Sequence, residues 1–119
     1  TFESTAVRDV HVLGDSIQVA PGMPKSGHMA NSQAKVAAAA IVAQLSGWEV
    51  NPAPMLNNTC YSFVDDKRVV HVASVHGYVP AEKTFKTIAG SGGLSPAPAE
   101  LEGTYAMNWA HNIWADTLG

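Results

Sequence analysis

The segment "HVLGDSIQ", residues 11–18, places a carboxylate and a hydroxyl side by side behind a short apolar run. In a Gly-Asp-Ser motif, Ser16 could act as the nucleophile of an esterase, provided that a histidine activates its hydroxyl. Alternatively, Asp15 at the end of a strand could accept hydrogen bonds from the hydroxyl groups of a flavin's ribityl chain. One tripeptide therefore admits two different chemistries.

The esterase interpretation needs a second motif, Asp-x-x-His, to supply the base and the group that orients it. No aspartate in the chain has a histidine three positions later. A length of 119 residues is also short for an esterase of this type. The Ser16 nucleophile is therefore the least favoured alternative, because the motif lacks its required context.

The flavin interpretation depends on the loop and helix that come after Asp15. The loop "APGMPKSG" contains prolines and glycines that exclude a helix until about residue 27. Good helix formers then continue from His28 to Ser46, with Ser26 as the expected N-cap and Gly47 as the stop. The free N–H groups and positive charge at this helix start would suit the pyrimidine side of a flavin.

The remaining elements alternate between short β-rich runs and polar or Gly/Pro-rich breaks. The segment "VRDVHVLGD" predicts a strand with Val10 and Val12 on one face. The expected core face of the helix consists of small or aliphatic residues: Ala34, Ala37, Ala38, Ile41 and Leu45. Further along, we expect a break at 51–58, a hairpin of 60–64 and 69–75 around the polar turn 65–68, a third strand within 82–88, a flexible connection at 89–100 and an amphipathic helix over 105–118. This order predicts an α+β fold.

Composition excludes several classes of function. With 46 % hydrophobic residues, the chain has enough apolar material for one compact domain. A formal charge of −3 and the absence of a basic stripe argue against nucleic acid binding. No apolar run approaches the ~20 residues that cross a bilayer. The five histidines form no metal-ligand cluster, and His71 and His76 would point to opposite faces of a strand.

Four segments together carry a specific resemblance: "HVLGDS", "MPKSGHMANSQAKVAAAAI", "LNNTCYSFV" and "NWAHNIWAD". The chain resembles the C-terminal portion of the flavoprotein subunit of flavocytochrome c sulfide dehydrogenase, in the disulfide reductase-like flavoprotein superfamily. The resemblance implies that residues 1–50 end an FAD-binding domain and that residues 51–119 form an interface domain covering the flavin, as in FAD/NAD-linked reductases. It also implies FAD as cofactor, sulfide as substrate, and transfer of electrons to the haem of a c-type cytochrome subunit in the periplasm.

The same resemblance assigns roles to individual residues. Cys60 would be one half of a redox disulfide, with its partner cysteine in an N-terminal part outside this chain. Asp15 would bind the ribityl chain, and the adjacent Gly14 would also belong to the cofactor-binding residues. The residues Gly27, His28 and Met29 would present backbone N–H groups to the flavin. In addition, Trp114 would lie near the flavin ring.

One feature departs from the family pattern: no G-x-G-x-x-G motif is present to hold the pyrophosphate of FAD. The chain also begins "TFESTAV", without a starting methionine, so we expect a piece of a longer reading frame. On its own it is not expected to hold FAD tightly. From the residues alone, Cys60 is either a buried thiol or a cysteine bonded outside this chain.

A second hypothesis treats the chain as an interaction module without catalysis of its own. Residues 1–50 would then expose apolar faces that pack against another part of the protein, so we predict self-association of the isolated chain. Trp48 and Trp109 are interpreted as packing residues. The charged turn 65–68 is expected to be solvated and to carry no chemistry.

Overall fold

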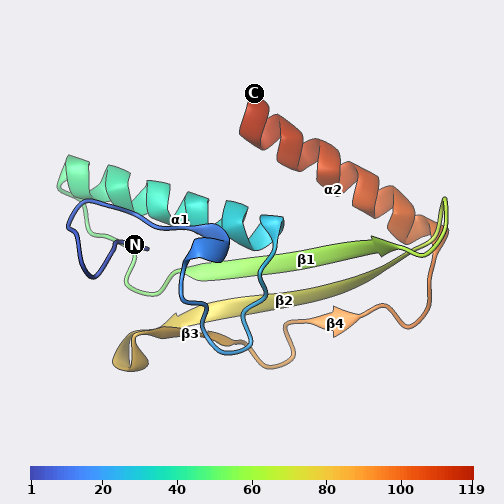
Figure 1. Cartoon of the computed structure of the whole chain (residues 1–119), viewed down its shortest axis with the longest axis horizontal. Coiled ribbons are helices and arrows are strands. Elements are labelled where there is room, and N and C mark those ends of the chain that lie inside the picture. Colours follow the sequence, from blue (N-terminus) through green and yellow to red (C-terminus); the bar gives the residue numbers. More distant parts are fainter.

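Two long antiparallel strands form the centre of the computed structural model, which describes residues 1–119. Both helices lie beyond the same edge of this strand pair (Figure 1). The elements in chain order are η1 (Gly14–Ser16), α1 (Gly27–Ser46), β1 (Met55–Phe63), β2 (Val69–Val79), η2 (Pro80–Glu82), β3 (Thr84–Thr87), β4 (Gly93–Leu94) and α2 (Glu100–Leu118). The sheet order is β1-β2-β3, with β4 also pairing with β2. The predicted α+β class is confirmed.

The first helix has the limits that the sequence predicts. The Ser26 hydroxyl accepts the Met29 N–H at 3.0 Å, which satisfies one of the free donors of the first turn. Gly47 ends the helix with a positive φ of 68°, a conformation that costs glycine little. Between them, 20 residues without an internal proline or glycine form the helix.

The face that α1 buries differs in part from the predicted one. Ala37 is buried and Ala34 and Ile41 are half-buried, but Ala38 and Leu45 are exposed, so the prediction is wrong for these two. The residues that the helix buries are Met29, Ser32, Gln33, Ala37, Ala40 and Ala43. The reason is that α1 lies along the edge strand β1 and not across the face of a sheet. Polar residues of the helix, among them Ser32, therefore face the strand in place of Ala38 and Leu45.

Side chains of α1 close the free edge of β1. The N–H groups of Asn57 and Thr59 point away from β2 and reach the Ser32 hydroxyl at 3.2 Å and His28 Nδ1 at 2.9 Å. Exposed backbone donors at a sheet edge otherwise invite pairing with another chain. The polar residues Ser32 and His28 therefore face the sheet because they replace the missing neighbouring strand.

Strand register determines which residues of β1 share a face. Leu56 pairs with His76 and Cys60 with Val72, so these four lie on one face of the sheet. That face carries the small core of Met23, Met29 and Leu56, packed under the segment before α1. As predicted, His71 lies on the opposite face from His76, where α2 packs.

The predicted first strand is wrong. Residues 7–13 form no strand; Glu3 and His11 make one isolated bridge, and Asp15 lies in the short 3-10 helix η1 rather than at a sheet edge. Val10 is 46 % exposed. Alternating side chains favour a strand only where a neighbouring strand pairs with it, and no strand of this chain lies beside residues 7–13.

Three predicted boundaries also need correction. The expected break at 51–58 ends early, because β1 already begins at Met55 and includes two asparagines. The expected flexible connection contains β4, and Ser91 and Ser95 hydrogen-bond to the backbone of β2. The last helix begins five residues earlier than predicted, at Glu100. The third strand is confirmed at Thr84–Thr87.

A polar cluster ties the start of α2 to β2. Glu102 Oε2 accepts hydrogen bonds from the Ser95 hydroxyl at 2.5 Å and from His71 Nδ1 at 3.0 Å. The Ser95 hydroxyl in turn accepts the backbone N–H of His71 at 2.7 Å. The hydrogen bond from Ser95, followed by that from His71, holds the pKa of the Glu102 carboxyl below its ordinary value.

Acid should therefore loosen the attachment of α2. A carboxyl with a lowered folded pKa stabilises the fold above its unfolded pKa and loses this contribution as pH falls through the folded pKa. We expect the melting temperature to fall more steeply below about pH 4.5 in the wild type than in Glu102→Gln. The matched control is Glu100→Gln, at an exposed position two residues earlier. Equal pH dependence of Glu102→Gln and wild type would contradict this account.

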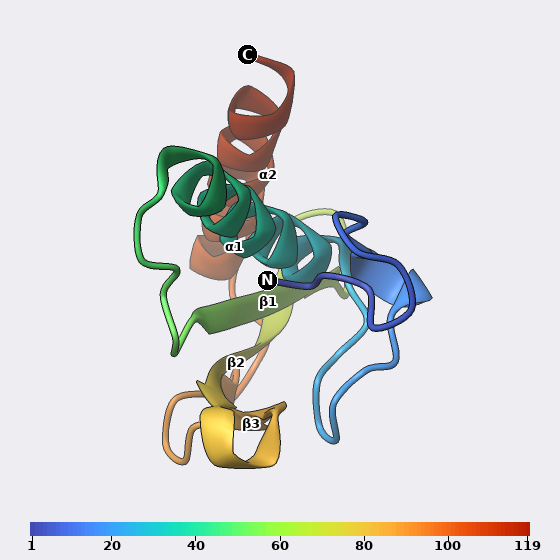
Figure 2. The same cartoon turned by 90° about the vertical axis from the view of Figure 1, so that its left-hand side faces the viewer.

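The molecule is more extended than its length predicts, in contrast to the expected compact domain. Its radius of gyration is 16.1 Å, against about 13.5 Å for a compact domain of this size. Its accessible surface of 7753 Å² exceeds the roughly 6200 Å² expected for its mass. The side view shows α2 and the segment before α1 projecting on different sides of the sheet (Figure 2). Neither helix is apolar enough over its length to span a membrane.

Candidate functional site

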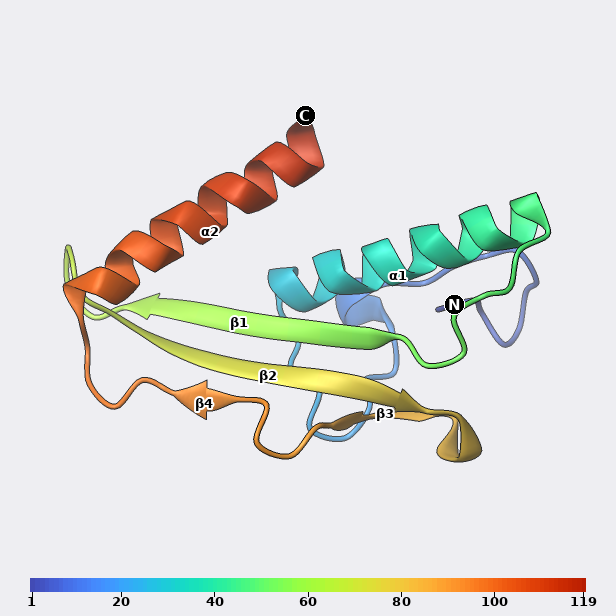
Figure 3. The ribbon, with the colours of Figure 1, turned by 180° about the vertical axis from the view of Figure 1, so that it is seen from behind.

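Three segments meet around the first turns of α1: η1, the loop that leads into the helix, and the middle of β1 (Figure 3). The Gly14 N–H donates to Gln33 Oε1 at 2.7 Å, and Gln33 is almost completely buried. Gly14 has a φ of 68° and lies close to Ala30 of α1. These contacts hold η1 against the helix and leave the Asp15 side chain exposed. The Lys25 ammonium donates to the Asp15 carbonyl at 3.3 Å.

The start of α1 offers two free backbone donors. The N–H groups of Met29 and Ala30 are satisfied by the side chain and carbonyl of Ser26. The N–H groups of Gly27 and His28 have no acceptor in the chain. A Cβ atom added at Gly27 would meet nothing within 4 Å, so the helix start is uncovered around this residue. Open donors at the positive end of a helix suit a ligand atom that carries negative charge.

Cys60 is connected to this helix end through Asn58. The Ser26 hydroxyl donates to Asn58 Oδ1 at 2.5 Å, and Asn58 Nδ2 donates to Cys60 Sγ at 3.4 Å. Asn58 is buried, whereas Cys60 is a half-buried free thiol. The fold thus brings the predicted redox cysteine and the predicted flavin-contacting helix start into one hydrogen-bonded group.

His28 has a free backbone N–H at the helix start, whereas its ring packs against β1 and α2. Its Nδ1 accepts the Thr59 N–H, which only an unprotonated nitrogen can do. Burial lowers the pKa of His28, in agreement with this acceptor role. The ring lies edge-on to Trp109, with centroids 5.3 Å apart.

Trp109, rather than Trp114, is the tryptophan at the start of α1. It also contacts Tyr61 of β1, and its Nε1 is buried without a hydrogen-bond partner. Trp114 is 55 % exposed and packs only on His111 of its own helix among the aromatic rings. The spacing of Trp109 with the buried Ala106 places it on the inner face of α2, a pattern visible in the sequence.

No arrangement for acyl transfer is present. The Ser16 hydroxyl donates to the Leu13 carbonyl at 2.6 Å and contacts no histidine. The cluster of Ser95, His71 and Glu102 contains the right residue types, but serine and glutamate both lie at the same nitrogen, Nδ1. A hydrolase needs its serine and its acid on opposite nitrogens of the imidazole. No group of three or more His, Cys, Asp or Glu residues could hold a metal ion.

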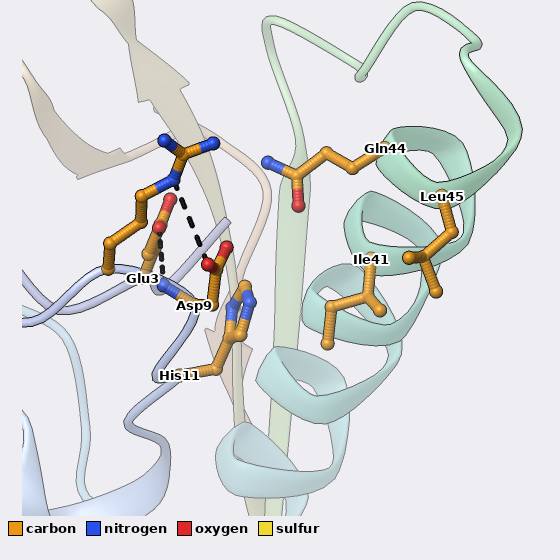
Figure 4. Close-up of a pocket in the computed structure, with 7 residues that line it drawn as sticks. Glu3, Asp9, His11, Ile41, Gln44 and Leu45 are labelled. Carbon is orange, nitrogen blue, oxygen red and sulfur yellow. Dashed lines mark hydrogen bonds and ion pairs between the residues drawn. The ribbon is translucent and has the colours of Figure 1, made fainter.

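An open pocket lies between the N-terminal segment and the last turns of α1 (Figure 4). Its charged groups and its histidine already have partners: Glu3 accepts the Asp9 N–H, Arg8 pairs with the Asp9 carboxylate, and His11 hydrogen-bonds to the Thr1 carbonyl. The remaining polar residue is Gln44, a neutral amide that does not titrate, so the pocket offers no set of catalytic groups.

Comparison with known proteins supports one family. The family model described as flavocytochrome c sulphide dehydrogenase, flavin-binding, matches residues 52–118, which is more than half of the chain. The matched region extends from the approach to β1 to the end of α2 and contains Cys60, Asn58 and Trp109.

Proposed function

Because the chain belongs to the flavin-binding family of flavocytochrome c sulphide dehydrogenase, we propose that it forms part of the flavin and disulfide site of an FAD-dependent sulfide dehydrogenase. One observation carries the proposal: Cys60 is linked through Asn58 and Ser26 to a helix end with two open backbone donors. A redox cysteine must lie beside the group to which it gives electrons, and this helix end is where the fold can receive a flavin.

The residues present fit a flavin. The N–H groups of Gly27 and His28 would donate to the pyrimidine side of the ring, where negative charge gathers on reduction. The exposed Asp15 carboxylate, held nearby on η1, would accept hydrogen bonds from ribityl hydroxyls. Trp109 lies at this end of α1, where its ring contacts His28. The only aromatic ring that Trp114 contacts is His111 of its own helix.

In the proposed reaction, Cys60 forms a disulfide with a cysteine from outside this chain. Hydrosulfide attacks the partner sulfur, the disulfide bond breaks, a persulfide forms on the partner, and Cys60 is released as a thiolate. Asn58 Nδ2 then donates to the thiolate sulfur and holds it in place. When bound, the flavin supplies a two-electron acceptor that releases electrons singly to the haem of a c-type cytochrome subunit. Sulfide as substrate and a periplasmic location are part of this proposal.

A docking role without chemistry is the second candidate, favoured by the surface of the molecule. The roughly 1600 Å² of accessible surface above expectation for this mass is about twice the ~800 Å² that one partner buries in a standard protein interface. Large apolar side chains that remain exposed on the two helices and directly after α1 include Val42, Leu45, Trp48, Met107, Trp114 and Leu118. These residues would pack against the rest of the flavoprotein, the cytochrome subunit or a second copy.

Non-reducing peptide mass mapping of the intact source protein, together with its visible spectrum, tests the proposed function. We expect a flavin spectrum and a peptide in which Cys60 is joined to a second cysteine. A colourless protein with a free Cys60 thiol would reject the redox role and leave the docking role.

A further inference from the structure

We propose that Asn58 is a positioning residue that couples the positive end of α1 to the sulfur of Cys60 and so stabilises its thiolate. The inference rests on the proposed redox role of Cys60, and it assigns a function to a residue whose type carries no chemistry by itself. It is based on the direction of three successive hydrogen bonds.

Every donor in this chain of hydrogen bonds points toward the sulfur. The Met29 N–H donates to the Ser26 hydroxyl oxygen at 3.0 Å. The Ser26 hydroxyl donates to Asn58 Oδ1 at 2.5 Å, and Asn58 Nδ2 donates to Cys60 Sγ at 3.4 Å. Hydrogen bonds aligned in one direction polarise one another, so the partial positive charge of the helix start is passed toward the sulfur.

The Ser26 hydroxyl is hydrogen-bonded to the oxygen end of the Asn58 amide. Its oxygen accepts the Met29 N–H, and its proton is donated to Asn58 Oδ1. This orientation leaves Nδ2, a donor, nearest the sulfur. Asn58 Oδ1 lies 3.6 Å from Sγ and can accept only from the neutral thiol, so loss of the thiol proton leaves the Nδ2 bond. The reversed amide would bring Oδ1 closer and repel a thiolate.

Burial strengthens this effect. Asn58 is 3 % exposed, so its amide exchanges no hydrogen bonds with bulk water. Across the sheet, Cys60 pairs with the uncharged Val72. The titratable groups near Cys60 on the elements packed against β1 include His76 of β2, held by the hydroxyls of Ser74 and Thr87. They also include His28 of α1, whose Nδ1 accepts the Thr59 N–H, and Asp15 and Lys25 of the segment before α1. None of them hydrogen-bonds to Cys60.

Alkylation by iodoacetamide of Cys60 in the reduced protein, followed by peptide mass, tests the proposal without any bound flavin. A net hydrogen-bond contribution of about 0.7–1.4 kcal/mol to the thiolate corresponds to a three- to tenfold change in the fraction of reactive thiolate. We therefore expect Asn58→Leu to react about 3- to 10-fold more slowly than wild type at pH 7 and to come within about twofold of wild type at pH 9.5, above the ordinary pKa of a thiol. Asn58→Asp should be slower still at pH 7, because its carboxylate faces the sulfur.

The matched control is Asn57→Leu. Asn57 contacts Ser32 of α1 from the next position of β1 but lies on the other face of the sheet. This variant loses a comparable helix contact and should alkylate at the wild-type rate. If circular dichroism shows that Asn58→Leu is unfolded, the test uses Asn58→Asp, which keeps the side-chain shape. The alkylation rate of this variant at pH 7 then decides the proposal.

Two outcomes would overturn the proposal: a wild-type rate in the Asn58 variants at pH 7, or equal slowing at both pH values, which would indicate altered access to the thiol. Neither outcome bears on the redox disulfide itself, which the mass mapping of Cys60 tests separately.

Discussion

Replacing Cys60 by serine should abolish sulfide-dependent reduction of cytochrome c in the intact enzyme and leave the flavin bound. In the proposed mechanism hydrosulfide attacks a disulfide that serine cannot form, so we expect turnover to fall by about 100-fold or more. The groups proposed to hold the flavin lie on η1 and α1, and they do not depend on the thiol. The visible spectrum of the variant should therefore remain that of a flavoprotein.

The control is Ser62→Ala, which changes the same face of β1 two residues further along, at an exposed position. It should retain normal turnover. Normal turnover in Cys60→Ser would remove the redox role of this residue, whereas loss of both turnover and flavin would show that Cys60 acts in binding rather than in electron transfer.

The largest effect on stability is expected at Gly103, where α2 crosses the turn after β1. A Cβ atom at this position would lie 2.2 Å from the Lys67 carbonyl oxygen, which is backbone and cannot rotate away. Alanine would gain about 1 kcal/mol in helix propensity. The clash must move the helix off the fully buried Val69 and so costs more, because overpacking at a rigid site typically costs about 1–3 kcal/mol and occasionally more.

We therefore expect Gly103→Ala to lower the free energy of unfolding by about 1–2 kcal/mol after the gain in helix propensity, measured by urea denaturation. Gly93→Ala is the matched control, since a Cβ there meets nothing within 4 Å and the backbone conformation is ordinary. It should leave the stability within about 0.5 kcal/mol of wild type. An unchanged stability of Gly103→Ala would mean that α2 is not held against the turn in solution.

Local patterns were enough to predict the elements whose ends depend on neighbouring residues. Ser26 and Gly47 define α1 because capping and a left-handed terminus involve residues only a few positions apart. The third strand and the α+β order were predicted for the same reason. The resemblance added the candidate role of Cys60, which composition and spacing alone left undecided.

Other features depended on contacts between residues far apart in the chain. The predicted strand at 7–13 has the correct alternation but no neighbouring strand to pair with. Conversely, the sequence predicts a break at Asn57 and Asn58, but both residues belong to β1. Their side-chain oxygens accept hydrogen bonds from Ser32 of α1 and from its N-cap Ser26, which lie 25 and 32 residues away in the chain.

The candidate site shows the same division. The sequence by itself determined which residue types were available: a single thiol, a capped helix start and a tryptophan-rich last helix. Only the tertiary structure decided that Asn58 joins the thiol to the helix start and that Trp109, not Trp114, packs there. The physical reason is that the direction of a side-chain hydrogen bond and the choice of the buried helix face both depend on the residues packed opposite. Those residues lie far away in the chain, and the sequence does not specify them.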